Sequence, residues 1–151
     1  MSSPTDSAPE EKDNVLETAA GLLAEGEIDV AAGTLFDAWS ADPGNRDLAV
    51  SYASLLAQVG RGAEAEELFA CLADEMPDDG RVWNNWGYLL LTRGEADIAL
   101  AKLGRALELS PRDFEATVNM GIALDRLGRT TEALDFHRQA AEINPNSPVV
   151  F

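Results

Sequence analysis

The chain has 151 residues, enough for one domain with a continuous core, and 46% of them are apolar. The net charge of −16 at pH 7 argues against nucleic acid and against an anionic membrane surface as partners. No apolar run approaches the roughly 20 residues that span a bilayer, so no membrane insertion is expected.

The first segment in chain order, residues 1–11, is rich in serine, proline and acidic residues. It shows no apolar periodicity, which predicts a disordered acidic tail. It also lacks the basic and apolar regions of a signal peptide. The single cysteine, Cys71, fits a reducing compartment. Together these features predict a cytoplasmic protein without an internal disulfide.

From Lys12 onwards the sequence repeats with a period of 34 residues. Several columns of equivalent positions carry the period: Pro43, Pro77, Pro111 and Pro145; Gly26, Gly60, Gly94 and Gly128; Leu22, Leu56, Leu90 and Leu124; Ala31, Ala65, Ala99 and Ala133; and the small residues Ala19, Ala53, Gly87 and Gly121. The units are 12–45, 46–79, 80–113 and 114–147. Residues 148–151 are either the start of a fifth repeat or a C-terminal tail. A fixed period of this size is typical of a solenoid, in which each repeat contacts its neighbours.

Each unit contains two stretches with helical apolar spacing, separated by the glycine column. In the third unit the pattern predicts helices over 82–92 and 96–109, with a glycine turn between them. The proline column ends each second helix. Polar residues near each proline are expected to cap the helix that follows, namely Asp42, Asp78, Asp113 and Asn146. The small column is expected to face the alanine column of the partner helix.

This pattern resembles the tetratricopeptide repeat (TPR) family. The third unit carries the resemblance best, in Trp83, Trp86, Gly87, Leu90, Gly94, Ala99, Leu103, Ala106 and Pro111. The resemblance implies an all-α, right-handed superhelical solenoid of four TPR helix-turn-helix repeats. It also implies that the first helices line a concave groove that binds a peptide or a partner helix.

The predicted first helices carry a second stripe of residues beyond the core face. This stripe either floors the groove or packs between successive first helices. Asn85 and Asn119 share one column. Peptide-binding members of the family often place an asparagine there, whose amide hydrogen-bonds the backbone of the bound peptide. The alternative role for these asparagines is an inter-helix or capping hydrogen bond. The predicted partner-binding residues are Arg81, Asn84, Asn85, Tyr88, Leu91, Val118, Asn119, Ile122, Val50 and Ser54.

No catalytic or metal-binding constellation is apparent in the sequence. His137 is the single histidine, and no nucleophile or general base is placed beside it, so neither an enzyme nor a cofactor is expected. The leading hypothesis is a protein–protein interaction module of the adaptor or chaperone-like kind. Its partner is expected to be neutral or basic with apolar anchors, because units 12–45 and 46–79 each carry −6. The acidity equally fits a salty cytoplasm.

Two alternatives remain open at this stage. The first alternative to an interaction module is a self-assembling structural repeat protein. The second is that the chain is the TPR part of a longer protein. Phe151 falls in the column of Trp83, so an array cut at this point would expose an apolar end face. Such a face would support a homo-oligomer through the C-terminal end.

Overall fold

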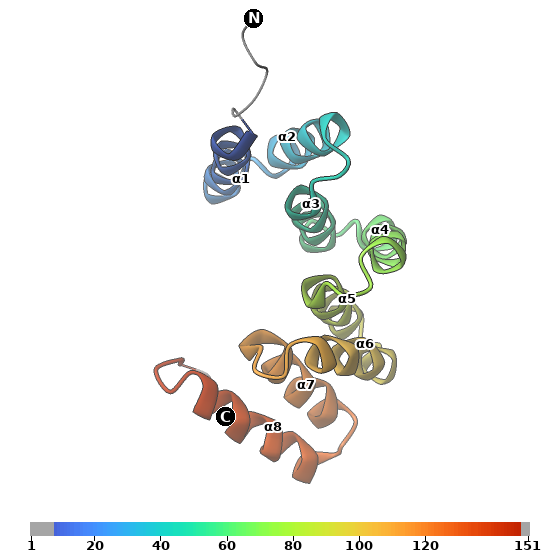
Figure 1. Ribbon diagram of the computed structural model, residues 1–151. Coiled ribbons are helices and arrows are strands. Elements are labelled where there is room, and N and C mark those ends of the chain that lie inside the picture. Colours follow the sequence, from blue (N-terminus) through green and yellow to red (C-terminus); the bar gives the residue numbers. More distant parts are fainter. Residues whose placement is uncertain (1–7, 149–151) are drawn as a thin grey trace, which may run out of the picture. The chain divides into compact units, whose positions relative to one another are not determined.

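The computed structural model describes residues 8–148, and every regular element in this part of the chain is a helix. Figure 1 shows the helices in chain order: α1 (Ala8–Ala24), α2 (Ile28–Ala41), α3 (Arg46–Gln58), α4 (Gly62–Glu75), α5 (Gly80–Thr92), α6 (Ala96–Leu109), α7 (Phe114–Arg126) and α8 (Thr130–Ile143). The all-α prediction is confirmed. Contacts divide the chain into unit 1, residues 1–65, and unit 2, residues 66–151, and each is described by itself.

The turn within each helix pair follows the glycine column. Gly26, Gly60, Gly94 and Gly128 have φ of 81°, 82°, 82° and 73°, a left-handed conformation that disfavours any residue with a Cβ. After α5, the N–H of Gly94 donates to Leu91 at 3.0 Å and the N–H of Glu95 donates to Leu90 at 2.9 Å. This pair of bonds satisfies two carbonyl groups that the end of a helix leaves open. The turn predicted from the glycines is therefore present.

Two of the four predicted caps lie too early in the sequence. The residues that cap α3, α5 and α7 are Asn45, Asp79 and Asp113, which stand one period apart. The Asp113 carboxylate accepts from the Ala116 N–H at 2.8 Å. Asp42 instead ends α2, and Asp78 lies one residue before the actual cap. A cap must directly precede the first helical residue for its side chain to reach the open N–H groups.

The remaining terminal predictions concern the two ends of the chain. Asn146 precedes no helix within residues 8–148. Helix α1 begins at Ala8, so residues 8–11 are helical although the sequence assigned them to a disordered tail. Proline at position 9 does not prevent this, because an N–H in the first helical turn has no intrahelical acceptor to lose. Residues 1–7 and Phe151 lie outside the described residues.

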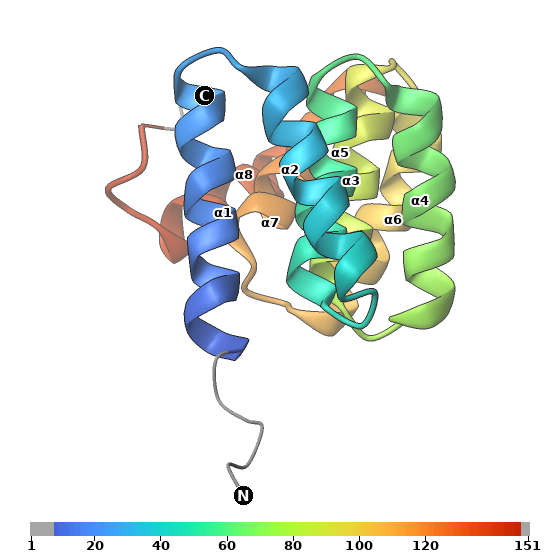
Figure 2. The same ribbon diagram turned by 90° about the horizontal axis from the view of Figure 1, so that it is seen from above.

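Unit 1 is built on helix α2, which packs against α1 on one side and α3 on the other (Figure 2). Ala31 and Leu35 of α2 are buried, as are Ala49 and Ala53 of α3. An aromatic cluster extends this core towards the surface, with the Tyr52 ring centroid 5.6 Å from that of Phe36 and 5.9 Å from that of Trp39. Tyr52 is buried, whereas Phe36 is 46% exposed.

Unit 2 contains the pairs α5–α6 and α7–α8, and α7 also packs against both α6 and α5. The core between them consists of Leu90, Leu91, Ala96, Ala99, Leu103, Met120, Ala123, Leu124 and Ala133. The Lys102 ammonium lies 3.7 Å from the centroid of the Trp86 ring, which stacks on Trp83. This cation–π contact fixes α6 against α5.

In unit 2 the side chains nearest to the glycines of the small column are not those of the alanine column. A Cβ built on Gly87 would lie 2.7 Å from both Cγ and Cδ2 of Leu103, and a Cβ on Gly121 would meet the His137 ring at 2.6 Å. Each glycine therefore accommodates a large side chain of the partner helix, four residues or about one helical turn beyond the alanine. Leu103 is fully buried in the space that Gly87 leaves.

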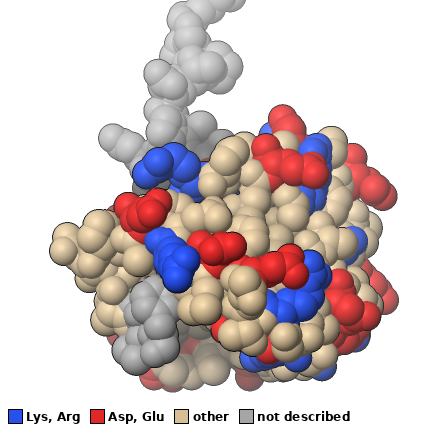
Figure 3. Space-filling model, turned by 90° about the horizontal axis from the view of Figure 1, so that it is seen from below, with Lys and Arg blue, Asp and Glu red and all other residues tan. Residues whose placement is uncertain are grey.

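Charged side chains of both signs lie close together on the face drawn in Figure 3. Ion pairs of this kind in unit 2 include Arg93–Glu66, Arg105–Glu108 and Arg129–Glu132. The hydrogen bonds of Arg129 lower the pKa of the Glu132 carboxyl below its ordinary value. In the described part of the chain, no helix has the length and apolar composition required to cross a bilayer.

Candidate partner-binding surface

The predicted first helices α5 and α7 of unit 2 are joined by a buried pair of asparagines. The Asn119 side-chain N–H donates to the Asn84 amide oxygen at 3.0 Å, and the two residues are 9% and 5% exposed. Of the two roles left open for Asn119, the inter-helix hydrogen bond is therefore present. Its partner is Asn84 and not the column mate Asn85, which is half-buried.

A second bond joins the same two helices at their C-terminal ends. Arg126, in the last turn of α7, donates from its guanidinium to the backbone carbonyl of Leu91 at the end of α5. Carbonyl groups in a last helical turn lack intrahelical donors, so a cation from the next repeat suits this position. The sequence analysis did not identify Arg126. The sequence signal that could have identified it is a basic residue that stands one 34-residue period after Thr92, the last residue of α5.

The apolar residues predicted for this surface differ in exposure. Tyr88 is 50% exposed, one helical turn beyond Asn84 on α5. Val118 and Ile122 of α7 are half-buried, and Ile122 also packs against the core of unit 2. Leu91 is 2% exposed and belongs to that core. Leu91 therefore supports the surface from below and offers no side chain to a partner.

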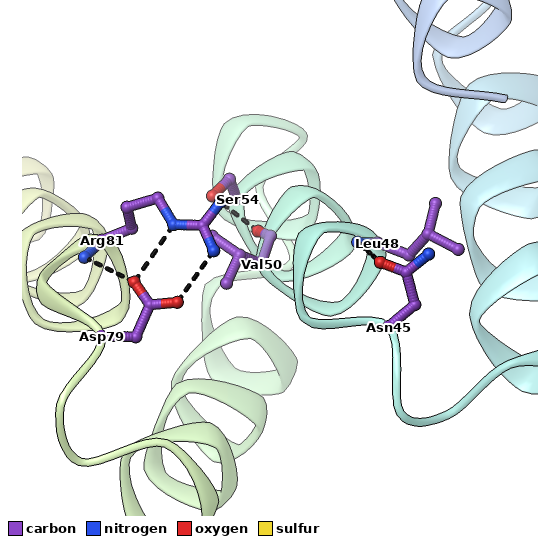
Figure 4. Close-up of polar contacts among 6 residues, drawn as sticks. All are labelled: Asn45, Leu48, Val50, Ser54, Asp79 and Arg81. Carbon is purple, nitrogen blue, oxygen red and sulfur yellow. Dashed lines mark hydrogen bonds and ion pairs between the residues drawn. The ribbon is translucent and has the colours of Figure 1, made fainter. Parts of the chain in front are cut away.

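Arg81, at the start of α5, is held by the residue that caps the helix. Its guanidinium nitrogens lie 3.1 and 2.8 Å from the two carboxylate oxygens of Asp79, and its backbone N–H donates to the same carboxylate at 3.0 Å (Figure 4). The side chain is exposed, and its charge is partly neutralised by this pair.

The two predicted residues of unit 1, Val50 and Ser54, lie one turn apart on α3. The Ser54 hydroxyl donates to the Val50 carbonyl at 2.8 Å (Figure 4). Val50 is 5% exposed, so its side chain contributes to packing and is not available as an anchor for a partner. Sequence periodicity placed both residues on one stripe of this helix, but it does not indicate how deeply that stripe is covered.

The single histidine, His137 of α8, packs against α7. His137 of α8 and Asp125 of α7 are joined by a contact of 2.8 Å between Nε2 and Oδ2, and the histidine ring lies against Gly121. The imidazole thus replaces the leucine that occupies the equivalent position in the preceding pair. Its geometry is that of an inter-helix contact that closes the α7–α8 pair.

Comparison with known proteins identifies the repeat. Family models described as tetratricopeptide repeat match residues 22–84 and residues 84–148. The chain belongs to the tetratricopeptide repeat family. Members of this family are typically protein-interaction modules. The two matches together include the helices that carry the candidate surface, α3, α5 and α7.

Solved structures of MamA, a TPR protein, share the fold. One, of MamA AMB-1, superimposes with a TM-score of 0.70 at 22% identity, covering 95% of this chain and 85% of that chain. MamA from Desulfovibrio magneticus RS-1, from residue 41 onwards, gives a TM-score of 0.72 at 18% identity, covering 89% and 76%. At these identities the similarity establishes the fold alone.

A curated relative extends beyond the present chain. The BBSome complex member bbs-4 of Caenorhabditis elegans is 22% identical over 125 residues, which are 83% of this chain. The match covers 27% of that relative, so the TPR chain spans about a quarter of its length.

Proposed function

We propose that this TPR chain is a non-catalytic interaction module that binds a segment of a partner protein across α5 and α7. The site consists of Tyr88 on α5 and of Val118 and Ile122 on α7, with the asparagine pair between them. Tyrosine supplies a large contact area with little loss of conformational entropy, which suits an anchor for a partner. Asn85 and Arg81 lie on the same helix as Tyr88 and flank this site.

The observation that carries this proposal is the incomplete pairing of the two asparagines. Within residues 8–148, the Asn84 amide nitrogen and the Asn119 amide oxygen make no hydrogen bond to another residue. One donor and one acceptor of the pair therefore remain, and the exposed Tyr88 lies one helical turn beyond Asn84 on α5. A peptide group presents the complementary acceptor and donor, so an extended backbone segment fits this pair.

The test uses peptides selected from a random phage-displayed library on the wild-type protein. We expect the Kd of the selected peptides, measured by fluorescence anisotropy, to rise at least about tenfold in Tyr88→Ala, the cost of losing a central aromatic anchor. Ile98→Ala on α6 is the matched control, since Ile98 is 46% exposed and lies outside the site. Equal affinity of the wild type and Tyr88→Ala would reject the α5–α7 surface.

Self-association through the C-terminal repeat is a second candidate. Leu127 and Leu134 are 40% and 47% exposed on the α7–α8 pair, and such side chains favour contacts between copies. Light scattering on the full chain is expected to show a dimer whose mass falls to that of the monomer in Leu134→Glu. A strict monomer at millimolar concentration would eliminate this candidate.

A further inference from the structure

The outward face of α2 in unit 1 carries apolar side chains that are about half exposed. Val30 is 52% exposed and Phe36 is 46% exposed. Helical geometry places Val30, Gly33 and Phe36 within about a third of the circumference of α2. Phe36 continues inward into the aromatic cluster with Trp39 and Tyr52, so this face, named the α2 face below, rests on a packed base.

Gly33 lies between the two apolar side chains of the α2 face. A Cβ built on Gly33 would have no heavy atom within 4 Å, so no intramolecular contact requires a glycine there. A glycine inside a helix costs about 1 kcal/mol relative to alanine. Its absent side chain leaves open space over the backbone between Val30 and Phe36, where a partner side chain can approach closely.

The charged residues from position 14 to the end of the α2 repeat are all acidic. Residues 14–45 contain six acidic residues and no lysine, arginine or histidine. Asp29 and Asp37 are exposed on the α2 face itself, and neither forms an ion pair with residues 14–148, whose side chains the structure describes. Arg61 lies within electrostatic range of Asp29, and its guanidinium is engaged by both carboxylate oxygens of Glu64.

We propose that the α2 face docks a basic amphipathic helix of a partner protein, with its apolar side chains over Gly33 and its lysines or arginines beside Asp29 and Asp37. Charge complementarity selects this occupant. A second copy of the same acidic face would be repelled, as would an acidic peptide. The α2 face shares no residue with the α5–α7 surface, so each proposal is tested by its own variants.

The corresponding face of α6 provides matched controls. Ile98 occupies the column of Val30 and is 46% exposed, and Asp97 occupies the column of Asp29. The column of Phe36 holds Gly104 in α6, and the column of Asp37 holds Arg105. The α6 face thus repeats one apolar position and one acidic position of the α2 face without its aromatic residue or its uniform charge.

The experiment measures binding of a fluorescent helical peptide, composed of leucine and lysine with the leucines on one face, to the full chain. The same peptide with glutamate in place of lysine is the charge control. We expect the lysine peptide to bind and the glutamate peptide not to bind. Val30→Lys, Phe36→Ala and the pair Asp29→Asn with Asp37→Asn should each raise Kd at least about tenfold, whereas Ile98→Lys and Asp97→Asn should leave it unchanged.

Each other outcome overturns the proposal. Equal binding of both peptides would show that charge does not select the occupant. Equal loss in Val30→Lys and Ile98→Lys would show a general effect of added charge. Loss in Tyr88→Ala without loss in the α2 variants would place the basic peptide on α5 and α7. Because the substituted side chains are exposed, each variant is expected to keep its helices, and circular dichroism checks this.

Discussion

Leucine at position 87 is expected to disrupt the α5–α6 pair and to lower the melting temperature of the protein sharply. Even the first added carbon, a Cβ, would lie 2.7 Å from Cγ and Cδ2 of Leu103, well inside the ~3.5–4.0 Å at which carbon atoms attract each other. Leu103 is fully buried and cannot turn into solvent. Gly87→Ala alone should cost about 1–3 kcal/mol, and the larger Gly87→Leu more.

A double-mutant cycle separates this steric effect from helix propensity. Leu103→Ala opens space opposite position 87, so Gly87→Ala should cost less in that background, with a coupling of about 0.5–3 kcal/mol. Gly104→Ala is the control, because a Cβ there meets no atom within 4 Å and alanine favours the helix. Urea denaturation provides the free energies of unfolding. Additive free energies for Gly87→Ala and Leu103→Ala would contradict the close approach of α5 to α6.

The second large effect is expected from Leu90→Ala. Leu90 is fully buried in the core of unit 2, which also contains Leu103, Met120 and Leu124. Removal of three carbon atoms from such a site loses transfer free energy and leaves a cavity, at a cost of about 2–5 kcal/mol. Leu127→Ala, at a position 40% exposed, should change the free energy of unfolding by no more than about 0.5 kcal/mol.

The comparison of these two leucine variants identifies the core directly. A Leu90→Ala protein with the free energy of unfolding of the wild type would show that the α5 and α7 pairs do not share a continuous core. Equal losses in Leu90→Ala and Leu127→Ala would show that burial does not determine the effect.

The elements that the sequence predicted well are those whose cause is local. The left-handed turn at Gly94 and the end of α6 before Pro111 follow from the conformations that single residues allow. The capping residue was harder to predict, because Asp78 and Asp79 are adjacent and chemically alike. Only the helix start, which depends on backbone geometry, distinguishes them.

The candidate surface was predicted less completely because it depends on how neighbouring helices are offset. Residues in one column occupy equivalent places on successive helices, yet column mates need not lie opposite each other. Asn119 therefore meets Asn84 and not Asn85. The same offset places Gly87 against Leu103 and buries Leu91. The 34-residue period identifies equivalent positions in the repeats, but it does not indicate how far neighbouring helices are shifted along each other.

The two bonds between α5 and α7 have a consequence for recognition. Asn84 and Asn119 fasten the helices near their midpoints, and Arg126 fastens them again at their C-terminal ends. Sliding of one helix along the other would break both fastenings together. The separation between Tyr88 and Ile122 is consequently set in the free protein. For the proposed α5–α7 site, such preorganisation spares a complex the entropy of aligning these side chains.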